Sequence, residues 1–183
     1  MPRRLFLSPF ATLFKLQSRR DTGLGKKFLS DSRTIMSTDN KNLEIRNKAM
    51  DLLARREHSA EELRQKLKSR DFDETSISSV MRGLQSEGLQ SDIRFTEAYI
   101  RQRFDAGLGP LKIRFELRQK GIDDAIAETF LDPLSDRWED SMKRQRERRF
   151  GETIPEDYAE RMKQARFLQN RGFSPESVMR LFR

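Results

Sequence analysis

The sequence predicts an all-α fold, organised as an elongated tandem array of three three-helix repeats. Three similar corners, about fifty residues apart, carry this prediction. At each corner a helix ends in a basic turn, the chain reverses, and an apolar residue precedes the cap of a new helix. The turn positions are Asp71, Gly121 and Gly172. A fixed period of this size is typical of repeat proteins. Because each repeat packs only on its neighbours, such an array presents an extended surface, and we expect the chain to lie along a long partner.

The composition supports thin helical layers rather than one thick core. The 183 residues are 35% hydrophobic and 36% charged, and they include no cysteine. Disulfides and thiolate zinc ligands are therefore excluded, and a reducing, cytoplasmic location fits best. The sequence has no run of about 18 apolar residues, so we expect no transmembrane helix and no membrane partner.

The net charge of +8 is concentrated near the N-terminus, since residues 1–35 hold eight Lys or Arg and only two Asp. The rest of the chain is nearly neutral, which makes a nucleic-acid-binding footprint over the whole domain weak. The basic cluster at 143–149 is interpreted as a solvated helix face, with a contact surface as the alternative.

Residues 1–40 are predicted to form a basic, disordered extension because they show no sustained helical period. Three origins remain open. The three interpretations are a basic arm, an organelle-targeting peptide, and an upstream extension ahead of a true start at Met36. The last is favoured, because the patterned sequence begins just after Met36.

The first repeat is assigned to residues 41–90. Its first helix is predicted from an apolar stripe at helical spacing, made of Ile45, Ala49, Leu52 and Leu53. Ser59 and Glu62 predict a capping box, in which Ser59 accepts a free amide and Glu62 reaches back to the cap. Asp73 is expected to cap the third helix, which ends near Gly88.

The second repeat, residues 91–133, follows the same order. Its first helix is expected to direct Phe95, Ala98 and Tyr99 inward, before a break at Gly107–Gly109. Pro110 suits the first position of a helix, where no amide hydrogen is needed. Gly121 permits a left-handed turn, and Asp123 is expected to cap the last helix.

The third repeat, residues 134–183, is the most divergent. Trp138 and Met142 mark its first helix, and a middle helix is expected to begin near Pro155. Ser174, followed by proline, is expected to cap the last helix. No segment alternates with period two, so the sequence predicts no strand.

The sequence offers little for catalysis, and we expect no enzyme, no cofactor and no metal site. His58 is the only histidine and adjoins Ser59, which is already explained as a cap, so His58 is assigned a structural role. The stretch 107–110 resembles a scrap of phosphate loop, but it lacks a preceding strand and a following Gly-Lys-Ser/Thr. It is interpreted as a helix corner.

Several segments resemble the RecX family of bacterial recombination regulators. They are residues 56–67, 92–103, 107–110, 116–117, 120–122, 150–151 and 166–173, together with Ile113. The likeness covers about three quarters of the chain, in order and at the right spacing. Two departures are Asp71, where the family usually has glycine, and the N-terminal extension of about forty residues.

The resemblance implies a monomeric stack of three-helix repeats that binds the RecA recombinase in the groove of its DNA filament. Family members suppress the ATPase, strand-exchange and co-protease activities of RecA, which affects DNA repair, recombination and the SOS response. DNA would be contacted through the filament. The competing interpretation is an autonomous helix-turn-helix-like array that binds nucleic acid, but its third helices open with acids at Asp73 and Asp123, which phosphate would repel.

We predict that the filament contact includes basic residues of the second repeat. They are Arg94, Arg101, Arg103, Lys112 and Lys120. Exposed arginine is suited to pairing with carboxylates and phosphates. The alternative is a solvated face with pairs within one helix, such as Glu97 with Arg101.

Overall fold

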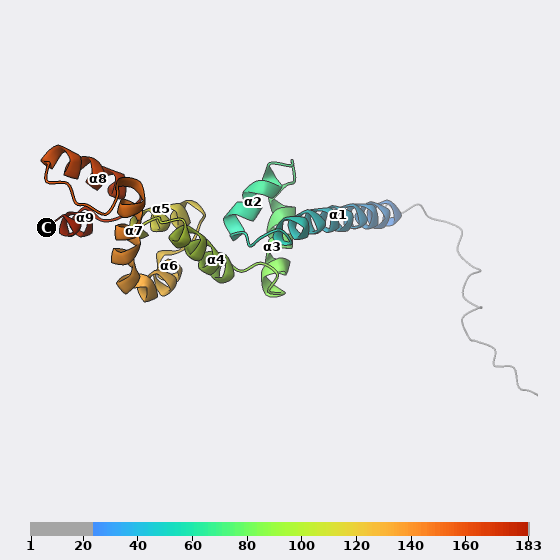
Figure 1. Cartoon of the computed structure of the whole chain (residues 1–183). Coiled ribbons are helices and arrows are strands. Elements are labelled where there is room, and N and C mark those ends of the chain that lie inside the picture. Colours follow the sequence, from blue (N-terminus) through green and yellow to red (C-terminus); the bar gives the residue numbers. More distant parts are fainter. Residues whose placement is uncertain (1–23, 183) are drawn as a thin grey trace, which may run out of the picture. The chain divides into compact units, whose positions relative to one another are not determined.

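The computed structural model describes the backbone of residues 24–182 and the side chains of residues 39–182 (Figure 1). Residues 39–182 form one compact unit, and the described residues before Asp39 belong to a separate one. Between Leu24 and Phe182 the regular structure is entirely helical, with nine α-helices, one 3-10 helix and no strand. The predicted fold class, an all-α tandem array of three three-helix repeats, is confirmed.

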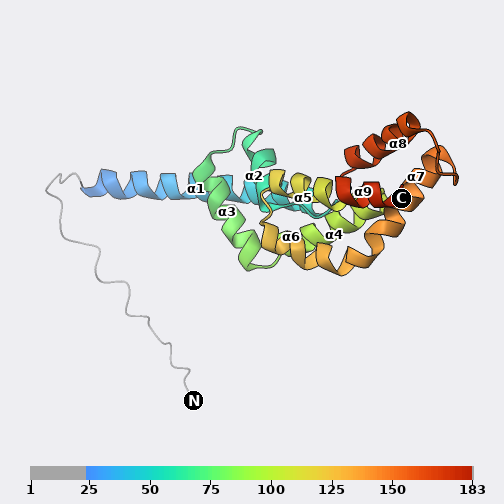
Figure 2. The ribbon, with the colours of Figure 1, turned by 90° about the vertical axis from the view of Figure 1, so that its left-hand side faces the viewer.

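Each repeat contains three α-helices in chain order (Figures 1 and 2). The first holds the C-terminal part of α1 (Leu24–Leu53), α2 (Ala60–Lys68) and α3 (Glu74–Ser86). The second holds α4 (Asp92–Asp105), α5 (Pro110–Gln119) and α6 (Asp124–Leu131). The third follows the 3-10 helix η1 (Asp132–Arg137) and holds α7 (Trp138–Phe150), α8 (Tyr158–Asn170) and α9 (Pro175–Leu181).

The core is divided into three apolar clusters, one for each repeat. In the first cluster, Ile45 and Ala49 are fully buried, as the apolar stripe predicted, and Leu52 and Leu53 pack against them. Trp138 packs against both the second and the third cluster, so it joins these two cores. Such separate, thin cores are expected when each unit packs on its neighbours alone.

The predicted helix caps are confirmed. The side chains of Ser59, Asp73, Asp123 and Ser174 each accept a hydrogen bond from a backbone amide two or three residues ahead. Pro110 is the first residue of α5. These contacts are made within one turn of the chain, which is why local sequence predicts them.

Half of the predicted capping box is wrong. Ser59 accepts from the amide of Glu62 at 3.0 Å, but the Glu62 carboxylate binds Lys120 and Arg56 and approaches His58. A charged partner forms a stronger hydrogen bond than a neutral amide does, and this decides the orientation of the carboxylate.

Three further expectations need correction. Ala98 is exposed, and α4 buries Ile100 and Phe104 instead. The ring of Phe104 packs edge-on against Trp138, with 5.0 Å between the two ring centres. The middle helix of the third repeat begins at Tyr158, after the cap Asp157, rather than near Pro155.

Helix α1 already begins at Leu24, within the segment 1–40 that was expected to be disordered. Residues 24–40 contain no proline, and extending a helix requires no new nucleus. The rest of that prediction, residues 1–23, lies outside the described residues.

A recurring contact joins successive repeats: the corner of one repeat lies against the middle helix of the repeat before it. A Cβ atom on Gly121 would come within 2.8 Å of the Glu61 side chain, and one on Gly172 within 2.3 Å of Lys112 Cβ. Asp71 occupies the same corner in the first repeat with φ of 61°. The Asp71 side chain is exposed, so packing does not demand glycine there.

Candidate interaction surface

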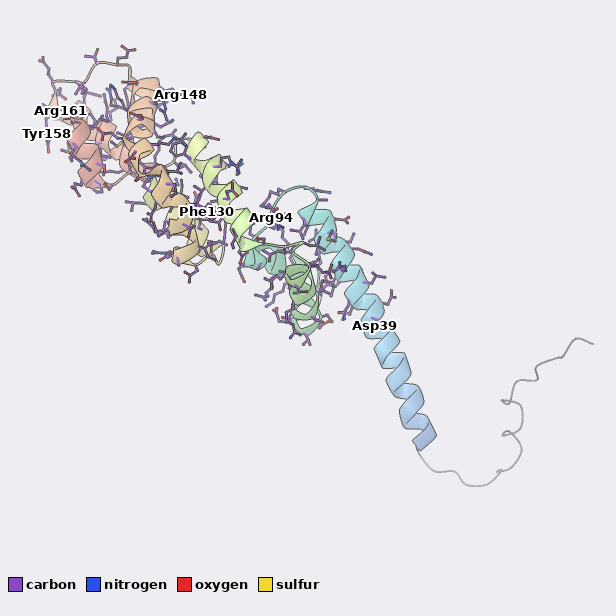
Figure 3. All side chains as sticks on the ribbon, turned by 90° about the horizontal axis from the view of Figure 1, so that it is seen from below. Asp39, Arg94, Phe130, Arg148, Tyr158 and Arg161 are labelled. Carbon is purple, nitrogen blue, oxygen red and sulfur yellow. The ribbon has the colours of Figure 1, made fainter. Side chains whose placement is uncertain are left out.

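The five predicted contact residues do not form one patch. Arg94, Arg103 and Lys120 lie where the first and second repeats meet, and Figure 3 labels Arg94 at the start of α4. Lys112 lies where the second and third repeats meet, and Arg101 lies on the exposed side of α4. The structure therefore brings Arg103 and Lys120 together and separates the other three.

Arg94 links the first two repeats. Its guanidinium forms an ion pair with Glu57 at 2.8 Å and donates to the carbonyl oxygen of Leu89 at 3.1 Å. Beside it, the Asp92 carboxylate accepts from the amide of Ala60 at 2.8 Å and from the side chain of Gln90 at 2.9 Å. Arg94 is thus already engaged within the chain.

Arg103 and Lys120 converge on Tyr99. The Tyr99 hydroxyl donates to Glu116 at 2.8 Å and accepts from Arg103 at 3.0 Å. The guanidinium of Arg103 lies 4.8 Å, and the ammonium of Lys120 5.4 Å, from the centre of the Tyr99 ring, as in cation–π contacts. Burial raises the pKa of Tyr99, and the adjacent Glu116 adds to this, so the hydroxyl keeps its proton.

Lys120 carries the network into the first repeat through its ion pair with Glu62. Burial raises the pKa of Glu62, but the hydrogen bonds and charges of Lys120 and Arg56 outweigh it and lower the pKa to about 2. Nδ1 of His58 lies 3.2 Å from the same carboxylate. Burial, aided by the charge of Arg56, lowers the pKa of His58, which favours a neutral, structural histidine.

These side chains line a polar groove of about 580 Å³ between α2 and the pair α4 and α5. The groove contains both cations and carboxylates, and Arg103 pairs with Glu116 while Lys120 pairs with Glu62. Such a groove holds repeats together more readily than it attracts a charged ligand.

Arg101 and Lys112 are the freer candidates. The Arg101 side chain is 67% exposed and pairs with Glu97 at 3.1 Å, which is the pairing named as the alternative interpretation. Lys112 is exposed and donates to the carbonyl oxygen of Asn170 at 3.4 Å.

The basic cluster at 143–149 is divided by burial. Arg146 is 2% exposed and donates to the carbonyl oxygens of Glu152 and Thr153, so it holds the loop between α7 and α8. Its neighbours Arg144, Arg148 and Arg149 are exposed, and Figure 3 labels Arg148 on α7. The view of this cluster as a uniform solvated face therefore missed a buried structural arginine.

Sequence reasoning also missed a second groove, of about 330 Å³, where the second and third repeats meet. Its apolar lining includes Pro110, Leu111, Leu131, Trp138, Met142 and Phe173. Leu111 and Phe115 are 45% and 59% exposed on α5. Their four-residue spacing, offset from the buried pair Ile113 and Leu117, is the signal that could have indicated a second apolar face.

In the described part of the chain, no three His, Cys, Asp or Glu side chains gather as they would to hold a metal ion. The same residues include no helix long and apolar enough to cross a membrane.

Comparison with known proteins identifies matches to each repeat in order. The family models described as RecX, first, second and third three-helix domain match residues 46–82, 91–131 and 138–182. The regulatory protein RecX of Halorhodospira halophila is 42% identical over 134 residues, covering 73% of this chain and 83% of that protein. That of Legionella pneumophila (strain Corby) is 42% identical over 135 residues, covering 74% and 90%.

Two solved structures have the same fold. The crystal structure of RecX from Lactobacillus salivarius matches with a TM-score of 0.65 and 25% identity, covering 79% of this chain and 97% of that one. A second crystal structure, of a regulatory protein RecX, matches with a TM-score of 0.71 and 23% identity, covering 81% and 76%.

Proposed function

This chain belongs to the RecX family of regulatory proteins, and from that membership we propose that it modulates the RecA recombinase by binding the RecA–DNA filament. Binding suppresses the ATPase, strand-exchange and co-protease activities of RecA. The protein thereby acts in the cytoplasm on DNA repair, recombination and the SOS response. The observation that carries the proposal is the ordered match of all three repeats, joined to 42% identity over 73% of the chain.

The proposed mode of action is binding rather than catalysis. The only histidine in the sequence is buried against Glu62. A tandem array instead offers side chains from successive repeats to an extended partner, and a filament is such a partner.

An autonomous nucleic-acid-binding array is the second candidate, and the structure gives it little support. Helix α3 starts with Asp73 at its cap and Glu74 in its first turn, and α6 starts with Asp123 and Asp124. In helix-turn-helix recognition the N-terminal residues of the recognition helix approach the bases, where these carboxylates would meet phosphate repulsion. Arg94, Arg103 and Lys120 are also neutralised by carboxylates of this chain.

Binding to RecA-coated single-stranded DNA, compared with bare single-stranded DNA across a salt series, tests the proposal. We expect clearly tighter binding to the coated DNA and a shallower loss of affinity between about 50 and 300 mM salt, because binding driven by phosphate contacts weakens steeply with salt. Equal affinity for both, with parallel steep slopes, would instead support the autonomous array.

A further inference from the structure

The groove between the second and third repeats is built from elements of both. Helix α5 lines it with Pro110 and Leu111, and η1 and the start of α7 line it with Asp132, Trp138 and Glu139. Helix α9 adds Ser177 and Arg180. Trp138 packs against both adjoining cores, and Phe173, from the third corner, also lines the groove. The groove is therefore lined by side chains that also pack in the adjoining cores.

The apolar surface continues out of the groove along α5. Leu111, 45% exposed, and Phe115, 59% exposed, are separated by one helical turn. Exposed apolar surface beside a groove, with an aromatic residue in it, is typical of a site that binds protein.

The charge around the groove is negative. Asp132 and Glu139 line it, and Asp136 and Asp140 are exposed on the same segment. Among the described residues none of these four carboxylates takes part in an ion pair.

Two cations of α5 do not offset this charge, because Arg114 pairs with Glu128 and Arg118 pairs with Asp124. The third, Lys112, donates to the carbonyl oxygen of Asn170 and does not line the groove. Arg180, at the end of the groove, binds only the Ser177 hydroxyl at 3.4 Å. The groove thus combines apolar side chains with two carboxylates, Asp132 and Glu139, that form no ion pair within the described part of the chain and outnumber the unpaired cation Arg180.

We infer that this groove binds a protein segment that carries an apolar side chain flanked by lysine or arginine, and that the RecA subunits of the filament supply it. The apolar side chain enters between α5 and Trp138, and the flanking cations meet Asp132 and Glu139. Nucleic acid does not suit this surface, because the carboxylates repel phosphate. The inference rests on the proposed function, and it identifies the surface of this chain that contacts the RecA subunits.

Two pairs of substitutions test the inference. Leu111→Ala with Phe115→Ala removes exposed apolar surface, and Asp132→Lys with Glu139→Lys reverses the charge of the two carboxylates that line the groove. Ile93→Ala, at a side chain 58% exposed on α4, is the control for the first pair. Glu44→Lys with Asp51→Lys, at exposed positions of α1, adds the same charge away from the groove and is the control for the second. Thermal unfolding verifies that each variant is folded.

Affinity is measured for RecA assembled on single-stranded DNA and for the bare DNA. Each groove pair should weaken binding to the filament by about tenfold or more, as expected for central interface residues, while the controls remain within about twofold. If the folded Leu111→Ala/Phe115→Ala protein binds the filament as the wild type does, the inference is wrong. It is also wrong if Asp132→Lys/Glu139→Lys binds filament or bare DNA more tightly than Glu44→Lys/Asp51→Lys does. A wild-type protein that does not bind the filament at all would instead overturn the proposed function.

Discussion

The backbone amide of Gly109 donates a 2.7 Å hydrogen bond to the carbonyl oxygen of Arg171, which joins the second repeat to the corner of the third. The amide of Leu111 adds a 3.0 Å bond to the carbonyl oxygen of Gly172. In return, the guanidinium of Arg171 donates to the carbonyl oxygens of Ala106 and Gly107. This joint is made largely of backbone groups, and it supports one end of the groove beside α5.

Replacing Gly109 with alanine should therefore destabilise the protein through overpacking. A Cβ atom there would lie 2.4 Å from the backbone of Gly172, and backbone cannot move aside as a flexible side chain does. We expect a loss of about 1–3 kcal/mol in the free energy of unfolding, measured by urea titration.

Gly88→Ala is the matched control for this joint. Gly88 has φ of 68° and no atom within 4 Å of its added Cβ, so only backbone strain of about 1 kcal/mol is expected there. A Gly109→Ala protein as stable as the wild type would show that the joint tolerates displacement.

Asp71→Gly should stabilise the first repeat. Asp71 holds φ of 61°, a left-handed conformation that costs a residue with a Cβ about 1 kcal/mol or more. Glycine removes this strain but gives the unfolded chain more freedom, so we expect a net gain of about 0.5 kcal/mol in urea unfolding. Asp71→Ala, which retains the strain, should give no gain. Loss of stability in Asp71→Gly would mean that the carboxylate makes a contribution that outweighs the strain.

The burial of His58 predicts a pH dependence of stability. The pKa of His58 in the folded protein lies below its ordinary value of 6.5, so the unfolded chain binds more protons between these two values. Stability should be fully present above about pH 6.5 and should fall as the pH drops toward the folded pKa.

Thermal unfolding between about pH 8 and pH 5 measures this effect, and His58→Gln should remove that part of the slope. The contribution of Glu62 is separable, because its pKa is lowered to about 2 and its stabilisation is lost only as the pH falls below the ordinary value of 4.5. An unchanged slope in His58→Gln would assign the pH dependence to other groups.

The structure determines which of the basic residues predicted as filament contacts can be changed without disturbing the fold. Arg101→Glu with Lys112→Glu changes exposed side chains and should weaken inhibition of the RecA ATPase without lowering the melting temperature. Adding Arg103→Glu to this double variant should lower the melting temperature, because Arg103 binds both Glu116 and Tyr99. Lys48→Glu with Arg82→Glu, at exposed positions of the first repeat, is the charge control. Full inhibition by the folded double variant would show that the contact lies elsewhere.

What the sequence predicted was decided by residues close together in the chain. Ser59, Asp73 and Asp123 cap helices through amides within the next turn, and Pro110 begins one, so the helices and their order were accessible. The three corners then predicted the repeats.

The candidate surface was less accessible because stacking of the repeats creates it. Glu62 meets Lys120, which lies 58 residues away, rather than the neighbouring cap. Leu111 lines a groove whose other wall comes from the third repeat. A list of basic residues likewise cannot reveal which of them, such as Arg94, are already paired within the chain.

The rate of ATP hydrolysis by RecA on single-stranded DNA, measured while this protein is added, tests the central claim most directly. We expect the rate of ATP hydrolysis to fall until it reaches a plateau as protein is added. The folded Leu111→Ala/Phe115→Ala variant should require about tenfold higher protein concentration for the same decrease. An ATPase rate that stays constant at saturating protein, while the protein binds bare DNA, would contradict the account.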